Sequence, residues 1–182
     1  VYLTQDALPM DDDWLESLLT PLSDEEVCAA YGRQVAYPDA KPMDQFFYSY
    51  FYPDDRRRLT ASDVTDEQEF YLENAFISDV AAAIDAEAFS DIGFRADVPM
   101  SEDKDFAFRA LEQGYVLAYE PTAAVYHSHD YSVVGAFNRR YKDGKAYTSI
   151  TTEGKDNSTS RGIEYFVREI RYLLFNGYTH YI

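Results

Sequence analysis

The spacing of apolar residues along the chain predicts alternating strands and helices. Residues 1–4 have the pattern of the end of a β-strand, and a loop separates them from a helix that the acidic run at 11–13 introduces. The apolar stripe of that helix comprises Trp14, Leu15, Leu18 and Leu19. A second apolar run at 27–31 predicts a β-strand, which we expect to end where Gly32-Arg33-Gln34 begins. The chain therefore begins as a mixture of strand and helix, which predicts the α/β class.

The middle of the chain is less regular. Residues 38–70 mix Pro, Asp, Tyr and Phe without a clean period, which predicts a long irregular segment that crosses the surface. An apolar run at 76–84 predicts a buried strand. Residues 87–92 then predict a short helix that Gly93 ends.

Helical and extended patterns alternate again after residue 100. Ser101 is the predicted N-cap of an amphipathic helix that Gly114 ends. Two short strands follow at 116–119 and 123–127, with Pro121 between them.

The last third of the chain is predicted to be mainly helical. Residues 131–147 have a helical pattern, and 151–160 form a polar loop. A final amphipathic helix at 163–175 carries Arg168 and Arg171 on its polar side. We expect one α/β domain at 1–150 with a mixed sheet, and a helical extension at 151–182.

The net charge of the chain argues against some classes of binding partner. The 182 residues are 46% hydrophobic, which is enough for one core. They include 33 acidic and 16 basic residues, a formal charge of -17, which argues against nucleic acid as a partner. A phosphorylated substrate would need a bound cation or a local basic patch. An acidic, solubilising surface explains most of this charge without any function.

Cysteine content and hydropathy bear on location. The single cysteine, Cys28, excludes an internal disulfide and a cysteine-rich zinc site, so the reducing cytoplasm is the simplest location. No apolar run approaches the roughly 20 residues that cross a bilayer, and no signal peptide is evident after Val1. We therefore expect a cytoplasmic protein.

Three groups of residues carry candidate chemistry. The first is Asp6, which follows a strand at the position where open α/β sheets place ligands, and a carboxylate there can bind a hard divalent cation. A lone Asp at this position is more often a turn or cap residue.

The second group is Glu102-Asp103, where burial and like-charge repulsion can raise the pKa of one carboxyl group and create a general base. The alternative is a charged first helical turn.

The third group is His127-Ser128-His129, which holds two of the three histidines in the chain. Imidazoles directly after a strand suggest a metal site, although a structural role is equally common. Because successive residues of an extended chain point to opposite sides, we expect only one of the two imidazoles to face a given site.

Taken together, the motifs resemble those of the inverting, family two nucleotide-sugar glycosyltransferases with the GT-A fold, and especially the rhamnosyltransferase-like branch. The resemblance covers residues 1 to about 147. The matching segments are Leu3-Thr4-Gln5-Asp6-Ala7-Leu8-Pro9, Tyr31-Gly32-Arg33-Gln34, Ser78-Asp79-Val80, Asp91-Ile92-Gly93-Phe94, Glu102-Asp103, Arg109, Gly114-Tyr115 and His127-Ser128-His129.

The resemblance implies roles for several of these residues. It implies that Asp6 and His127, with His129 as the second choice, hold Mg²⁺ or Mn²⁺ against the donor diphosphate. It implies that Asp103, with Glu102 beside it, is the base that activates the acceptor hydroxyl. The residues implied as substrate contacts are Arg33, Gln34, Asp79 and Arg109.

The implied reaction transfers a hexosyl group, and the rhamnosyltransferase-like branch implies that this group is rhamnosyl. The donor would be a dTDP- or UDP-sugar, and the acceptor a cell-surface polysaccharide or a lipid-linked saccharide. An enzyme of this kind would act in the cytoplasm, peripheral to the inner face of the membrane. The nucleotide-binding region of the family would precede Val1, so we expect this chain to be a C-terminal portion that is inactive alone.

Departures from the family pattern leave other functions open. Thr4 replaces the first acid of the usual metal motif, Asp79 stands where the family usually has Asn, and Asp85 where it usually has Arg. The changes at Asp79 and Asp85, together with the missing nucleotide-binding region, favour a rival interpretation, a non-catalytic carbohydrate-binding or assembly module derived from such an enzyme. The presence of Asp6, Glu102-Asp103 and His127 opposes it. A nucleotidyltransferase is a third, weaker possibility.

One further segment has two possible readings. The aromatic residues at 46–52 and the basic triplet at 56–58 could line an acceptor groove and hold a lipid diphosphate. Core packing explains most of the aromatic residues equally well.

Overall fold

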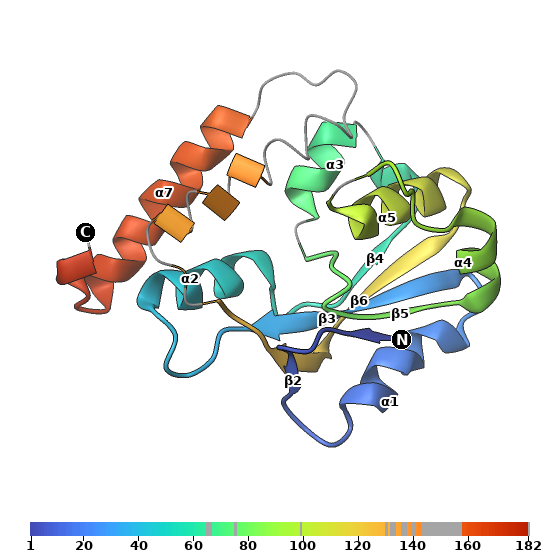
Figure 1. Cartoon of the computed structure of the whole chain (residues 1–182), viewed down its shortest axis with the longest axis horizontal. Coiled ribbons are helices and arrows are strands. Elements are labelled where there is room, and N and C mark those ends of the chain that lie inside the picture. The colour runs from blue at the N-terminus through green and yellow to red at the C-terminus, as the bar shows by residue number, and fades with distance from the viewer. Residues whose placement is uncertain are drawn as a thin grey trace.

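A computed structural model describes residues 1–64, 67–74, 76–98, 100–129, 131, 134–135, 138–139, 141–142 and 158–181, with the side chains of 67, 68, 72 and 158–161 not described. The fold is built on a six-stranded mixed sheet (Figure 1). The strands are β1 (Tyr2–Leu3), β2 (Leu8–Pro9), β3 (Val27–Val35), β4 (Arg57–Leu59), β5 (Ala81–Ile84) and β6 (Val116–Tyr126).

Two long strands form the centre of the sheet. The strand order is β1-β5-β3-β6-β2, and β4 pairs with the first half of β6. The central pair, β3 and β6, is parallel, whereas every other described pair is antiparallel. The mixed sheet confirms the predicted α/β class and agrees with part of a GT-A fold.

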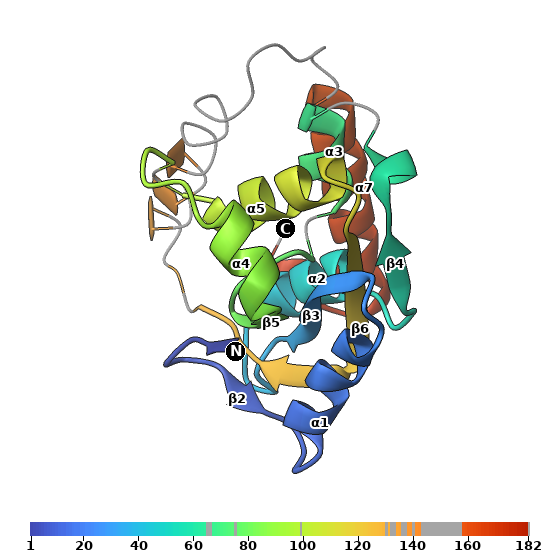
Figure 2. The same ribbon diagram turned by 90° about the vertical axis from the view of Figure 1, so that its right-hand side faces the viewer.

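Helices cover both faces of the sheet (Figures 1 and 2). On one face α1 packs through Trp14 and Leu18 against Ala30 and Val125 of the central strands. The opposite face meets α2, α4 and α5, and α7 lies outside α2. The helix bounds are α1 (Trp14–Leu19), α2 (Pro42–Phe51), α3 (Glu67–Glu73), α4 (Ala86–Ile92), α5 (Glu102–Glu112) and α7 (Ser158–Phe175), with 3₁₀ turns η1 (Thr20–Ser23), η2 (Ala61–Asp63) and η3 (Thr179–Tyr181).

The prediction of an irregular segment at 38–70 is wrong. This stretch forms α2, β4, η2 and the start of α3. Pro42 occupies the first turn of α2, where its missing N–H costs no hydrogen bond. The apolar period is hidden because α2 is covered on two sides: Phe46 contacts Tyr165 and Tyr172 of α7, while Tyr48 is buried toward the sheet.

The aromatic residues at 46–52 and the basic triplet both have structural contacts. The aromatic rings of α2 pack in the core and against α7. Arg56 pairs with the buried Glu120, Arg57 lies over the ring of Phe76, and Arg58 pairs with Asp24. Core packing and local ion pairs therefore account for this segment.

The strand bounds also differ from the prediction. β3 continues through Gly32, Arg33 and Gln34, and β6 runs unbroken past Pro121, whereas β5 begins only at Ala81. A register shift explains the first two differences. Gly32 pairs with Glu120, but Arg33 pairs with Ala124, so residues 121–123 bulge out of the ladder. Proline is tolerated in such a bulge because no ladder hydrogen bond is needed there.

The bulge is held by a buried carboxylate and by a close backbone approach. Glu120, which is 4% exposed, accepts hydrogen bonds from the backbone N–H of Thr122 at 3.1 Å and from its hydroxyl at 2.6 Å. The Arg56 guanidinium lies 2.8 Å from the same carboxylate. On the facing strand, a Cβ at Gly32 would lie 2.4 Å from the carbonyl oxygen of Ala123.

Helix starts and ends follow the predictions in part. Asp85 caps α4 through hydrogen bonds from the N–H groups of Glu87 and Ala88, and Gly93 ends that helix with a φ of 58°. Ser101 precedes α5 as predicted, but its side chain makes no cap hydrogen bond, because the residue is in the left-handed region with a φ of 65°.

The final helix is confirmed but begins earlier than predicted. α7 starts at Ser158 rather than at residue 163, and Arg168 and Arg171 are exposed. Most of the helix predicted at 131–147, and residues 151–157 of the predicted polar loop, lie outside the described residues.

Replacement of Gly32 by alanine tests the importance of the bulge. We expect Gly32→Ala to lower the free energy of unfolding by about 1–3 kcal/mol, because the added methyl group collides with a backbone carbonyl that cannot rotate away. Urea denaturation followed by circular dichroism measures the change. The control is Gly162→Ala in α7, where no described atom outside the adjacent residues and the helix backbone lies within 4 Å of the new methyl group. It should be neutral or stabilising by up to about 1 kcal/mol, and equal effects of the two changes would contradict the prediction.

Candidate functional site

Three side chains converge at the end of the sheet where β6 terminates. Asp6 lies in the loop between β1 and β2, and His127 and His129 follow β6 directly. One ligand atom from each of the three residues lies within 4.8 Å of the other two. His127 Nε2 is 3.6 Å and His129 Nδ1 is 3.7 Å from Asp6 Oδ2. The three residues predicted to bind a metal therefore form one cluster.

Backbone hydrogen bonds set the positions of these side chains. The N–H of Thr4 donates to the Val80 carbonyl, and the N–H of Ala7 donates back to the Thr4 carbonyl, so residues 4–7 turn tightly after β1. On the other side, the N–H of His127 donates to the carbonyl of Val35 at 2.8 Å. The end of β3 therefore holds the beginning of the histidine segment.

Both imidazoles face Asp6, so the expectation that only one would do so is wrong. Residues two apart in an extended chain point to the same side, and His127 and His129 have this spacing. Their rings meet edge to face with centroids 4.7 Å apart. His127 is 6% exposed, whereas His129 is partly open to solvent.

The electrostatics of the cluster suit a cation. Burial lowers the pKa of His127, and the neighbouring His129 lowers it further, so the ring is neutral at pH 7 with a lone pair to donate. Partial burial would raise the pKa of Asp6, but hydrogen-bond donors and the two imidazoles outweigh it and lower that pKa. One carboxylate and two imidazoles can hold a divalent metal, and nitrogen ligands fit Mn²⁺ better than the oxygen-seeking Mg²⁺.

Gln34 lies behind this cluster. Its side chain is 3% exposed, and its Oε1 lies 2.7 Å from His127 Nδ1. The amide nitrogen of Gln34 donates to the hydroxyl of the buried Tyr52 at 2.7 Å. The described contacts place Gln34 against a histidine and a tyrosine, and a direct contact with substrate remains a prediction.

The second predicted group lies at the start of α5. Asp103 is partly buried, and its carboxylate accepts the N–H of Asp79 at 3.1 Å and that of Lys104 at 2.8 Å. Burial raises the pKa of Asp103 to about 6, and the nearby Asp79 adds to the rise, whereas Lys104 opposes it. Burial and the charge of Glu102 also raise the pKa of Asp79. A carboxylate of this kind can accept a proton near neutral pH.

Two buried tyrosines lie within electrostatic range of the acidic group, and one of them, Tyr52, also contacts Gln34. Tyr52 binds Gln34 on one side, and burial, Tyr48 and Asp103 raise its pKa well above the usual value. Burial raises the pKa of Tyr31 in the same way, and Asp103 and Asp79 contribute. The carboxylates are therefore within electrostatic range of the residues that support His127.

The two arginines that were predicted to contact substrate both form hydrogen bonds or ion pairs within the protein. Arg109 donates to both Asp105 and the carbonyls of Ile92 and Gly93, at 2.7 to 2.9 Å, and so holds the end of α4 against α5. Arg33 pairs with the exposed Asp54. Substrate contact by either arginine remains a prediction.

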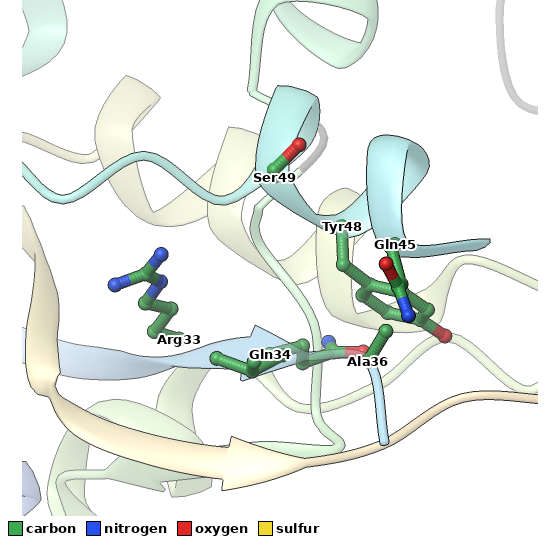
Figure 3. A pocket seen from close by; sticks show the side chains of 7 residues that line it. Arg33, Gln34, Ala36, Gln45, Tyr48 and Ser49 are labelled. Carbon is green, nitrogen blue, oxygen red and sulfur yellow. The ribbon is translucent and has the colours of Figure 1, made fainter. Parts of the chain in front are cut away.

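Arg33 also borders a small open pocket of about 100 Å³ between β3 and α2 (Figure 3). Its other walls include Gln34, Tyr48, Gln45 and Ser49. Sequence reasoning missed Tyr48 and Tyr52 as neighbours of the site, because both belong to the segment that had no recognisable period. Their signal was the density of aromatic residues, which does not show which ring faces the site.

Comparison with known proteins agrees with this geometry. Residues 48–178 match the family described as Glycosyl transferase family group 2. This chain belongs to that family. The matched range includes Asp79, Asp103, His127 and His129, and it begins after Asp6 and Gln34.

Two curated relatives are similar over nearly the whole chain. The O-antigen chain rhamnosyltransferase RfbN of Salmonella typhimurium (strain LT2) is 27% identical over 180 residues, and the O-antigen chain rhamnosyltransferase WbaN of Salmonella anatum is 28% identical over 180 residues. In each case the alignment covers 97% of this chain and 56% of the relative. The chain thus spans little more than half the length of these relatives. Among the described residues, no helix combines the length and apolar character that crossing a membrane requires.

Metal titration tests the cluster directly. Mn²⁺ should bind the chain, and Asp6→Ala or His127→Ala should weaken its affinity by more than about tenfold, because each removes a ligand atom. Isothermal titration calorimetry measures the affinity. His180→Ala in η3 is the matched control, since it removes the one histidine outside the cluster and should leave Mn²⁺ affinity unchanged. Equal affinity in all variants would show that the cluster does not hold the ion.

Proposed function

We propose that this chain carries the metal-binding and catalytic-base residues of an inverting glycosyltransferase. The enzyme would transfer a hexosyl group from a nucleotide-sugar donor to a saccharide acceptor. One observation carries the proposal: in a chain of glycosyl transferase family group 2, Asp6, His127 and His129 form a cluster whose ligand atoms suit a divalent ion. Burial, which raises the pKa of Asp103 to about 6, supports that residue as the base.

The first task of such a site is to bind an anionic donor in an acidic protein. A diphosphate is repelled by a chain whose formal charge is -17. Asp6, His127 and His129 would hold the ion, which when bound neutralises the diphosphate leaving group. Asp6 is the one carboxylate of this trio, so a divalent ion would exceed the negative charge that the three side chains supply.

The second task is to activate the acceptor hydroxyl. Asp103 would take the proton of that hydroxyl as the oxygen attacks the anomeric carbon from the side opposite the diphosphate, which inverts the configuration. The N–H groups of Asp79 and Lys104 hold both of its oxygens in place. Burial keeps its pKa high enough for it to act as a base near pH 7 rather than as a permanently ionised surface group.

The names of the relatives suggest the substrate. Both are O-antigen chain rhamnosyltransferases. We propose rhamnose from a dTDP donor first, with a UDP-sugar as the alternative, and a polysaccharide or lipid-linked saccharide as acceptor. An acceptor anchored in lipid would place the protein at the cytoplasmic face of the membrane. Because the alignment spans 56% of each relative, donor, acceptor and location are part of the proposal.

The rival reading, a non-catalytic carbohydrate-binding module, loses one of its supports. It rested in part on Asp85, which replaces a family arginine. In this structure Asp85 is the N-cap of α4, so the residue has a structural role that is independent of catalysis. Asp79 supplies a backbone N–H to Asp103, a contact that does not depend on its side chain.

Removal of the proposed base is the main test of function. In a protein that also carries the nucleotide-binding region expected before Val1, Asp103→Asn should reduce kcat for transfer from dTDP-rhamnose by at least about 100-fold, because an amide cannot take the proton of the acceptor. Donor affinity should remain within a fewfold of the parent. Glu112→Gln, an exposed carboxylate at the other end of α5, is the control and should leave kcat unchanged. Near-normal transfer by Asp103→Asn would exclude this residue as the base.

The pH dependence offers an independent check. With a pKa of about 6, Asp103 is increasingly protonated as the pH falls below 6 and is ionised above 7. The value of kcat/KM should therefore rise with pH and level off above an apparent pKa near 6, with a slope of about tenfold per pH unit on the acidic limb. Rates between pH 4.5 and 8 at saturating Mn²⁺ measure the profile. A profile that is flat down to pH 5 would contradict a base with a raised pKa.

A further inference from the structure

We propose that Gln34 is a positioning residue that holds His127 in the Nδ1-protonated form and thereby turns the Nε2 lone pair toward Asp6. The proposal rests on the metal site of the proposed function. It assigns to Gln34 a role that differs from the substrate contact implied by its sequence motif.

The hydrogen-bond chemistry of the two side chains supports this role. A neutral imidazole carries one N–H donor and one acceptor nitrogen. Oε1 of Gln34 can only accept a hydrogen bond, and it lies 2.7 Å from Nδ1 of His127. The proton of the ring must then be on Nδ1. Nε2, which is 3.6 Å from Asp6 Oδ2, is left free to donate its lone pair to a cation.

The Gln34 amide has a second buried partner. Its nitrogen donates to the Tyr52 hydroxyl at 2.7 Å. Gln34, Tyr52 and His127 are 3%, 6% and 6% exposed, so water has little access to compete for these bonds. Rotating the amide by half a turn would place its NH₂ group against Nδ1 and favour the opposite tautomer, in which Nε2 carries the proton and cannot bind metal.

A second hydroxyl near the ring is a weaker partner. Tyr48 Oη lies 3.4 Å from His127 Nδ1, and the two rings meet edge to face. A Tyr48 hydroxyl that donated to Nδ1 would also favour the opposite tautomer. At 3.4 Å this contact is at the limit of a hydrogen bond, whereas the contact to Gln34 has ideal length, so Gln34 determines the tautomer.

The register of the sheet brings Gln34 under the ring. Gln34 pairs with Val125 in the parallel ladder, and His127 lies two residues beyond Val125. This pairing places Gln34 beside the end of β6, from which His127 follows directly, and the two side chains meet there at 2.7 Å. This pairing exists only because the bulge opposite Gly32 shifts the register before Arg33.

An amide suits this site better than the carboxylate that often supports a metal-bound histidine. Both can accept the Nδ1 proton and fix the ring. Glutamine does so without adding another buried negative charge to a chain that already has a formal charge of -17. The acceptor atom, not the charge, is the essential feature.

The tautomer of His127 can be read without any metal. In ¹H–¹⁵N spectra of the metal-free chain labelled at histidine nitrogen, at about pH 7.5, His127 should show a protonated Nδ1 and an unprotonated Nε2. Gln34→Leu, which keeps the size but removes the acceptor, should shift the ring toward the Nε2-protonated form that predominates for free imidazole side chains in water. An unchanged His127 tautomer in Gln34→Leu would overturn the proposal.

Metal affinity provides the second readout. Gln34→Leu should weaken Mn²⁺ binding by about 10- to 100-fold. Gln34→Glu, which keeps an acceptor at the same position, should restore affinity to within a fewfold of the parent. The matched control is Gln45→Leu, since Gln45 borders the same pocket but donates to the Pro38 and Ala40 carbonyls and leaves His127 untouched. Failure of Gln34→Glu to restore binding in a folded protein would argue against a positioning role.

The two readouts separate this proposal from the metal site itself. A parent chain that binds no Mn²⁺, but whose His127 tautomer depends on Gln34, would refute the metal proposal and support the role of Gln34 in fixing the ring. A chain that binds Mn²⁺ equally well with glutamine or leucine at position 34 would refute the role of Gln34 and leave the metal site intact.

Discussion

The site depends on one close backbone approach, between Gly32 of β3 and the bulge in β6. Only a residue without a side chain can lie so near the Ala123 carbonyl, because a Cβ there would be 2.4 Å from that oxygen. Three residues of β6 leave the ladder opposite this point, and Glu120 and Arg56 hold them from the side. Every residue pair beyond the bulge, including Gln34 with Val125, takes its register from it.

The register set by the bulge also positions the residues of the candidate site. Beyond the bulge, the end of β3 receives the N–H of His127, and the β1–β2 loop brings Asp6 to the same place. Gln34 and Tyr52 support the ring from behind, and Tyr52 lies within electrostatic range of Asp103 on α5. The hydrogen-bonded groups of the metal cluster and the acidic group of α5 are therefore supported by the same core face.

The candidate metal site contains fewer carboxylates than the acidic composition of the chain suggests. The proposed metal trio contains a single carboxylate, and its other two members are imidazoles. Burial raises the pKa of Asp103 to about 6 and also raises the pKa of Asp79, so the local environment changes how readily these two carboxyl groups ionise. A formal charge counted from composition therefore says little about the charge at the site.

The sequence by itself determined the fold class, the order of most elements and the residues of the metal cluster. These features have short-range causes: apolar periods of 2 and 3.6 residues, a glycine after α4, and carboxylate or imidazole groups just after strands. The α2 segment escaped recognition because its apolar residues face both the sheet and α7, which removes the single-stripe pattern.

Tertiary structure alone decided how these residues are used. Gln34 and Arg109 carry polar groups that a motif assigns to substrate, but the fold places one against His127 and the other against Asp105 and the end of α4. The two histidines both reach Asp6 because of a strand end and a register shift made by residues 32 and 120–124. Contacts between residues so distant in sequence depend on backbone packing, which no local pattern of side chains encodes.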